Sequence, residues 1–174
     1  SQIMNSFRDI ETAAKNINWF KDIKDIANPD DPICKNWLCY TAWMTDKLRN
    51  EFPQHTLKVT DESFGEIPPM LRDIKENAVG LKREIKISVV KNVSIFAQTF
   101  APNSTLEKNP WIKDLGNNPL GGKLSLIKDI KRVGLLFSKV NVGDSRVLCR
   151  RSSFEFNSEF IHLVEAFPSS LNEI

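Results

Sequence analysis

The chain has 174 residues, of which 41% are hydrophobic and 26% are charged, a balance typical of one globular domain with a sizeable core. Its 24 Lys and Arg residues stand against 22 Asp and Glu residues, so the formal net charge is only +2. This balance argues against a nucleic-acid-binding protein, which needs a clustered basic face, whereas here the basic residues are interleaved with acids.

Two amphipathic segments occupy the first fifty residues. Residues 6–26 place apolar side chains at helical spacing and predict a helix within an N-terminal helical extension of about residues 1–30. Residues 28–32 contain two prolines and interrupt the helical pattern. Pro32 then starts a second predicted helix, which runs to about residue 52. Periodicity favours core packing for its apolar stripe. The aromatic residues near this stripe, which belong either to the core or to a pocket for a ring, are Trp37, Tyr40 and Trp43.

The middle of the chain alternates between apolar and polar residues, as β-strands do. A short strand is predicted at 56–60, and residues 61–79 have no clear pattern apart from a possible helical turn. Residues 81–90 and 93–101 are both strongly β-prone and are separated by a short polar turn. They therefore predict a β-hairpin.

The last third of the chain predicts a short helix at 103–115 and then a glycine-rich turn at 117–122. Backbone amides of such turns sometimes bind anions, although most of these segments are only turns. The segment 127–132 is predicted to be helical, and two further strands are predicted at 146–156 and 159–167. No repeat or composition break divides the chain, so one domain over residues 1–174 is expected.

Arg83 stands out in the predicted strand 81–90. Alternate residues of a strand point to opposite faces, so Arg83 falls in an apolar row. A guanidinium group keeps its charge at accessible pH, and its burial therefore requires an anionic partner. The apolar row consists of Leu81, Ile85, Ile87 and Val89, and the opposite row, expected to face water, of Lys82, Glu84, Lys86 and Ser88.

Glu165 repeats this anomaly in the last predicted strand, where it shares a face with Ile161, Leu163 and Phe167. Two misplaced charges of opposite sign favour either a buried Arg83–Glu165 salt bridge or a shared cavity for a ligand. Desolvation roughly cancels the attraction in a buried ion pair, so stability alone is a weak reason for keeping one. A ligand carboxylate on Arg83 would satisfy the guanidinium group, with Glu165 left to accept or donate a proton.

Arg150 and Arg151 form a second basic element, which either lies at the surface or is partly enclosed. The three cysteines, Cys34, Cys39 and Cys149, have no metal-ligand spacing, so reduced thiols and no metal site are expected. The first thirty residues lack a signal-peptide pattern, and no run of about eighteen apolar residues is present. A cytoplasmic protein without a membrane span is therefore predicted.

Six segments are distinctive in their sequence, order and spacing. They are WMTDKLRNEF at 43–52, LKREIKI at 81–87, TFAPNSTL at 99–106, LGNNPLGGKL at 115–124, RRSSFEF at 150–156 and LVEAFP at 163–168. Together these segments resemble the chorismate lyases (chorismate–pyruvate lyases), which make 4-hydroxybenzoate at the start of ubiquinone synthesis. The resemblance spans roughly residues 33–170. The chain departs from the family at Gln98, where a basic residue is frequent, at Cys149, and at Gly122-Lys123.

The resemblance implies an α+β fold: an antiparallel sheet of about six strands with helices on one face and helical flaps over a buried pocket. It implies that Arg83 binds the ring carboxylate of chorismate and that Glu165 contacts the oxygen at the para position. Backbone amides of Met44 and Leu120 are the implied further contacts. Our own weaker inference is that Arg150 or Arg151 neutralises the enolpyruvyl carboxylate.

An enzyme of this kind needs no metal or redox cofactor, because elimination of pyruvate from chorismate is driven by aromatisation. We expect a monomer whose partners are chorismate and 4-hydroxybenzoate, and no nucleic acid. The alternative is a non-catalytic domain that binds aromatic acids, as in the ligand-sensing domains of some transcription regulators with a similar fold. Those domains normally follow a DNA-binding helix-turn-helix, and the residues before Ile33 show only one amphipathic helix.

Overall fold

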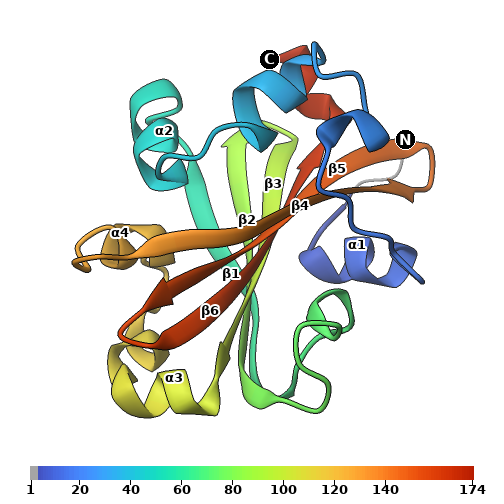
Figure 1. The fold of residues 1–174 in the computed structure, drawn as a ribbon. Coiled ribbons are helices and arrows are strands. Elements are labelled where there is room, and N and C mark those ends of the chain that lie inside the picture. Colours follow the sequence, from blue (N-terminus) through green and yellow to red (C-terminus); the bar gives the residue numbers. More distant parts are fainter. Residues whose placement is uncertain (1–3) are drawn as a thin grey trace.

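The fold is built on one six-stranded antiparallel sheet in the order β1-β2-β3-β6-β5-β4. It is seen in a computed structural model that describes residues 4–174 (Figure 1). The predicted α+β class and the predicted six strands are confirmed. The strands are β1 (Thr56–Glu66), β2 (Val79–Val90), β3 (Val93–Pro102), β4 (Lys131–Val142), β5 (Ser145–Phe156) and β6 (Glu159–Pro168).

Short helices cover both faces of the sheet. One face packs against η2, α2, η4, α4 and η5, and this face carries the pocket described below. The other face packs against α1 and η3. The sequence-based prediction placed helices on one face only and did not include this second layer. The helices are α1 (Phe7–Ala13), η1 (Ile23–Asp25), η2 (Cys34–Leu38), α2 (Met44–Glu51), η3 (Pro69–Leu71), α3 (Asn103–Lys108), η4 (Pro110–Asp114), α4 (Leu120–Leu124) and η5 (Ser169–Glu173).

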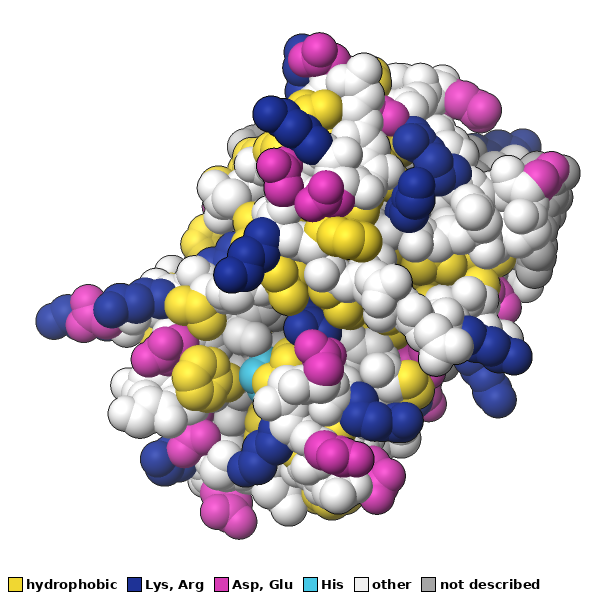
Figure 2. Space-filling model, turned by 45° about the vertical axis from the view of Figure 1, so that its right-hand side comes forward, with side chains coloured by type: hydrophobic (Ala, Val, Ile, Leu, Met, Phe, Trp, Pro, Cys, Tyr) yellow, Lys and Arg dark blue, Asp and Glu magenta, His cyan; other side chains and the backbone are white. Residues whose placement is uncertain are grey.

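The surface carries both signs of charge. In the view of Figure 2, basic and acidic side chains are mixed over the face, in keeping with the formal net charge of +2. A clustered basic face of the kind that binds nucleic acid is not seen in this view.

The predicted helix at 6–26 is shorter than expected. It ends at Ala13, and Asn16 then adopts a left-handed conformation with φ 56°. Beyond this turn the chain runs along the edge of the sheet, where Phe20 and Phe137 exchange two backbone hydrogen bonds of 2.8 and 2.7 Å. Pairing with β4 therefore replaces the helix, a contact between residues more than one hundred positions apart.

The second predicted helix, from Pro32 to about residue 52, is interrupted. It forms as the π-helix η2, an irregular segment and then α2. Arg150 accounts for the interruption, because its Nη1 donates to the backbone carbonyls of Trp37, Leu38 and Tyr40. These carbonyl groups point toward Arg150. In a continuous helix they would instead point along the helix axis to amides of the following turn.

The predicted hairpin is present, with β2 and β3 in antiparallel register. The two further predicted strands, β5 and β6, also pair with each other and are joined at Asn157 and Ser158, both with positive φ. The predicted helix at 103–115 is divided at Asn109, whose φ of −135° is not helical. The predicted helix at 127–132 is wrong, because β4 begins at Lys131 and pairs with β5.

The burial of Glu84 shows that the prediction of a water-exposed face on this side of β2 is wrong. The side chain is only 3% exposed, because α1 and η3 cover this face. Gln98 Nε2 donates to Glu84 at 2.6 Å and to Glu11 at 2.8 Å, so one amide serves two carboxyl groups. Burial raises the pKa of Glu84, the Gln98 hydrogen bond and Lys82 oppose the rise, and Glu11 adds to it.

We expect Glu84→Gln to stabilise the protein at neutral pH by roughly 1 kcal/mol, because it removes a buried charge and keeps a hydrogen-bond acceptor for Gln98. A raised carboxyl pKa means that the folded state binds the proton more tightly than the unfolded state does. Stability is therefore lost as pH rises from the ordinary pKa of a glutamate through the raised value. Urea unfolding at several pH values should show this loss in the wild type and a flatter profile in the variant.

The matched control is Glu107→Gln, which changes an exposed glutamate of α3 and should leave both stability and its pH dependence unchanged. A Glu84→Gln protein that is less stable than the wild type at neutral pH would contradict the prediction.

Candidate functional site: a pocket between the sheet and two helices

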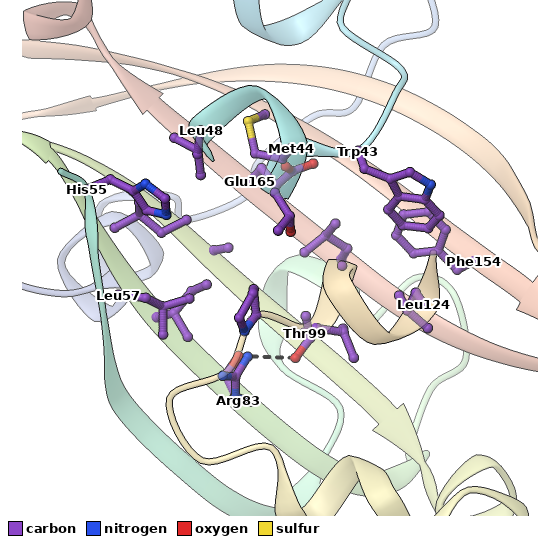
Figure 3. A pocket seen from close by; sticks show the side chains of 18 of the residues that line it. Trp43, Met44, Leu48, His55, Leu57, Arg83, Thr99, Leu124, Phe154 and Glu165 are labelled. Carbon is purple, nitrogen blue, oxygen red and sulfur yellow. Dashed lines mark hydrogen bonds between the residues drawn. The ribbon is translucent and has the colours of Figure 1, made fainter. Parts of the chain in front are cut away.

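A cavity of about 230 Å³ lies between one face of the sheet and the helices α2 and α4. An apolar cavity of about 150 Å³ already holds benzene, so this one accommodates a substituted six-membered ring. Most of its lining is apolar, with a few charged and polar groups (Figure 3). The charged lining residues are Arg83, Arg132 and Glu165, and among the apolar ones are Trp43, Leu48, Leu57, Ile85, Leu124, Phe154 and Leu163.

Arg83 comes from β2 and is 3% exposed. Its Nη2 donates to the backbone carbonyls of Gly116 and Asn118, at 3.1 and 2.8 Å, so the loop before α4 fixes the guanidinium group. Within residues 4–174 its Nε is buried without a hydrogen-bond partner, and the carboxylate of Glu62 lies 3.8 Å away. Burial lowers the pKa of Arg83 and Glu62 opposes this, and the guanidinium remains charged. Arg83 is thus a buried cation with donor capacity to spare.

Glu165 comes from β6 and reaches the same pocket from another side, as Figure 3 shows. Its partner is Arg150, its direct neighbour on β5, whose Nε and Nη2 donate to the two carboxylate oxygens at 2.7 and 3.3 Å. Within the described residues, no ion pair joins Arg83 to Glu165. Of the two interpretations of these misplaced charges, the shared cavity fits the geometry and the direct salt bridge does not.

Neither arginine of the Arg150–Arg151 pair lines the pocket. Arg150 is fully buried beside Glu165, where its donors are used by that carboxylate and by the carbonyls at the end of η2. Arg151 points to the opposite face of the sheet, since neighbouring strand residues alternate. There it forms hydrogen bonds with Asp73, at 2.6 and 2.8 Å, and with the carbonyl of Met70. In this structure neither side chain reaches the cavity, and their donors are engaged by other groups.

Met44 and Leu120 line the pocket and are the first residues of α2 and α4. The first N–H groups of a helix lack intrahelical acceptors and favour oxygen atoms with negative charge. The two helix starts also touch: a Cβ built on Gly121 would lie 2.8 Å from Thr45 Oγ1. Two helix starts thus close one side of the cavity, and glycine allows them to approach.

Sequence reasoning missed Arg132, because the segment that contains it was interpreted as a solvated helix. Arg132 lies in β4 opposite Phe154, and its guanidinium carbon is 4.7 Å from the centre of that ring. The side chain is 14% exposed, and its Nη1 donates to Ser152 Oγ at 2.7 Å. No local pattern distinguishes it from the exposed lysines around it.

His55 is a second lining residue for which the sequence suggests no role. Its Nδ1 lies 2.7 Å from the carbonyl oxygen of Phe52. A carbonyl only accepts, so Nδ1 carries the proton, which leaves Nε2 of a neutral ring as an acceptor.

The arrangement suits a small organic anion with a ring. In proteins generally, guanidinium groups of this kind can bind carboxylates, apolar walls can hold a ring, and a carboxylate beside the ring can transfer a proton. In the described part of the chain, no group of three or more His, Cys, Asp or Glu side chains is placed to hold a metal ion. Among residues 4–174, no helix is long and apolar enough to cross a membrane.

Comparison with known proteins identifies a family for the chain. A family model described as chorismate lyase matches residues 13–171, which is most of the chain and includes every strand of the sheet and every pocket residue named above. None of the curated proteins with which the sequence was compared matches it.

Proposed function

Because the chain belongs to the chorismate lyase family, we propose that it converts chorismate to 4-hydroxybenzoate and pyruvate. Family membership supports a lyase with a small-molecule substrate, and the particular reaction is our proposal. The resemblance noted in the sequence suggests a role in the first step of ubiquinone synthesis, in the cytoplasm.

The observation that carries the proposal is the buried guanidinium of Arg83, which faces an apolar cavity with its Nε unpartnered. Leaving a charged donor buried and unpaired is costly, so the site is built for an anion. The ring carboxylate of chorismate supplies one, and the apolar walls accept the ring. Glu165 would then lie near the opposite end of the ring, where the hydroxyl group is attached.

The chemistry proposed here balances without a further reactant. The ring carbon that bears the hydroxyl loses its proton, the C–O bond of the neighbouring ring carbon breaks, and the ring becomes aromatic. The departing enolpyruvate takes up a proton at carbon and becomes pyruvate. In this proposal Glu165 accepts the ring proton or holds the hydroxyl group, and either interaction is strengthened where the bound substrate excludes water.

The helices α2 and α4 contribute by enclosing the substrate. We assign the N–H groups of Met44 and Leu120 to oxygen atoms of the substrate, because both start a helix and line the pocket. Holding the substrate with its ether and its ring proton aligned lowers the barrier without any covalent intermediate.

The test is to incubate the purified protein with chorismate and to measure 4-hydroxybenzoate by absorbance and pyruvate by a coupled assay. We expect equal amounts of the two products from the wild type. We expect a rate at least about tenfold lower from Glu165→Gln, which keeps the shape of the side chain and a partner for Arg150 but removes the charged acceptor.

The alternative, a domain that binds aromatic acids without turning them over, predicts a different result. Such a protein would bind 4-hydroxybenzoate and release no pyruvate from chorismate. Tight binding of the aromatic acid without turnover would therefore replace the lyase assignment by the binding assignment.

A further inference from the structure

We propose that Arg132 forms a second anion subsite in the pocket and binds the enolpyruvyl carboxylate of chorismate. This inference rests on the proposed function and adds to it a residue that neither the sequence pattern nor the family description assigns.

Two contacts hold the guanidinium of Arg132 at the wall of the pocket. Its Nη1 donates to Ser152 Oγ at 2.7 Å, and the group lies over the ring of Phe154 at 4.7 Å. The same Nη1 is 3.9 Å from Oε1 of Glu165, which is too far for a hydrogen bond. The planar group is therefore fixed in orientation while keeping donors for another partner.

Arg132 has only a weak, shared partner for its charge. Among the described residues, its Nε is buried without a hydrogen-bond partner. The carboxylate near it, Glu165, lies 3.9 Å from Nη1 and already receives two hydrogen bonds from Arg150. Burial lowers the pKa of Arg132, Glu165 opposes this and Arg150 reinforces it, yet a guanidinium group stays protonated in proteins. The result is a half-buried positive charge in a cavity wall that is only partly compensated and that can bind an anion in the cavity.

The charges around the pocket match a dianion. Arg150 compensates Glu165, and this leaves Arg83 and Arg132 as two guanidinium groups in one cavity. Glu62 is 35% exposed and 3.8 Å from Arg83, so it compensates that arginine only weakly. Chorismate carries two carboxylates on different arms of the molecule. If Arg83 binds the one on the ring, Arg132 is the remaining cation for the other.

The position of Arg132 beside Glu165 agrees with the connectivity of the substrate. The enolpyruvyl ether is attached to the ring carbon next to the one that bears the hydroxyl. With Glu165 at the hydroxyl carbon, the enolpyruvyl group must lie against the neighbouring wall, where Arg132 is. When the C–O bond breaks, negative charge moves onto the enolpyruvate, so Arg132 stabilises the leaving group as well as the bound substrate.

The subsite predicts a difference between substrate and product, because 4-hydroxybenzoate has no enolpyruvyl arm. We expect Arg132→Gln to lower kcat/KM for chorismate roughly 10- to 100-fold, the range for loss of a hydrogen-bonded charged partner. The Kd of 4-hydroxybenzoate, measured by calorimetric titration, should change by less than about threefold. Arg132→Lys should recover part of the lost kcat/KM, because it restores the charge without the planar fork.

Two further variants make the comparison decisive. Arg83→Gln should weaken chorismate and 4-hydroxybenzoate alike, because both carry the ring carboxylate. Arg49→Gln alters an exposed arginine of α2 that does not line the pocket, and should change neither ligand. Thermal melting of each protein shows whether it is folded, and Arg132→Lys carries the test if Arg132→Gln does not fold.

The outcomes separate this inference from the proposed function. If the wild type releases pyruvate and Arg132→Gln retains its kcat/KM, or loses affinity for both ligands equally, the subsite is wrong and the lyase assignment stands. If the wild type releases no pyruvate from chorismate, the lyase assignment fails and the subsite fails with it.

Discussion

Replacing Arg83 with alanine is expected to reduce kcat/KM for chorismate by about 10³-fold, the largest effect on activity that we predict. The substitution removes the guanidinium group of β2 that lines the pocket. Backbone carbonyls of the loop before α4 hold this group in place. The ring carboxylate would then lose the guanidinium group that we assign to it, and Arg132 would be the cation left in the cavity wall. Steady-state kinetics with pyruvate detection measures the loss.

Arg83→Lys is the informative companion variant. Lysine keeps the charge but cannot donate to Gly116 and Asn118 while also reaching a carboxylate in the same fixed geometry. We expect an activity between those of the wild type and Arg83→Ala. An Arg83→Ala protein that turns over chorismate at nearly the wild-type rate would show that the ring carboxylate binds elsewhere.

Replacing Arg150 with methionine is expected to have the largest effect on stability, a decrease of about 3 to 5 kcal/mol in the free energy of unfolding. Arg150 is fully buried and donates to both oxygens of Glu165. It also donates to the carbonyls of Trp37, Leu38 and Tyr40. Its removal leaves a buried carboxylate without its main partner and frees the segment that leads into α2.

A double-mutant cycle tests this account by urea unfolding. Arg150→Met combined with Glu165→Leu removes both charges, so the double variant should be more stable than the sum of the two single effects implies. Arg49→Met, at an exposed position of α2, is the control and should cost less than about 0.5 kcal/mol. Additive effects, or a loss below about 1 kcal/mol for Arg150→Met, would mean that Glu165 does not depend on Arg150.

The two charged residues that anomalous patterning singled out, Arg83 and Glu165, lie in the same cavity. Their positions were predictable because strand alternation is local: each strand by itself shows which side chains share a face. The hairpins were predictable for the same reason, since short polar turns join β2 to β3 and β5 to β6. The roles of Arg83 and Glu165 in catalysis remain predictions.

Arg132 was not predictable because its local pattern fits a helix. Ile127 and Ile130 are three residues apart, and both pack partly against the core cluster around α4. Asp129 then adopts a positive φ of 61°, and the chain turns into β4. What makes the following residues a strand is their pairing with β5, in which Arg132 lies opposite Phe154. That pairing partner is not visible in the segment itself.

The opposite face of the sheet was misjudged for a related reason. The alternation in β2 predicts that Lys82 and Glu84 lie on a face exposed to water. In the structure, α1 and η3 cover that face and bury Glu84. Nothing within β2 indicates whether a distant helix will pack on it. Gln98, at a position where the resemblance leads one to expect a basic residue, lies between the carboxyl groups of Glu84 and Glu11.

By itself, the sequence determined the class of fold, the strands at each hairpin and the presence of an arginine and a glutamate in apolar rows. Only the tertiary structure decided which cation neutralises Glu165. The order β3-β6-β5 places Arg150 directly opposite Glu165 and leaves Arg83 and Arg132 at the cavity. The physical reason is that the row in which a side chain lies depends on local backbone geometry, whereas the partner of a charge depends on strand order and register.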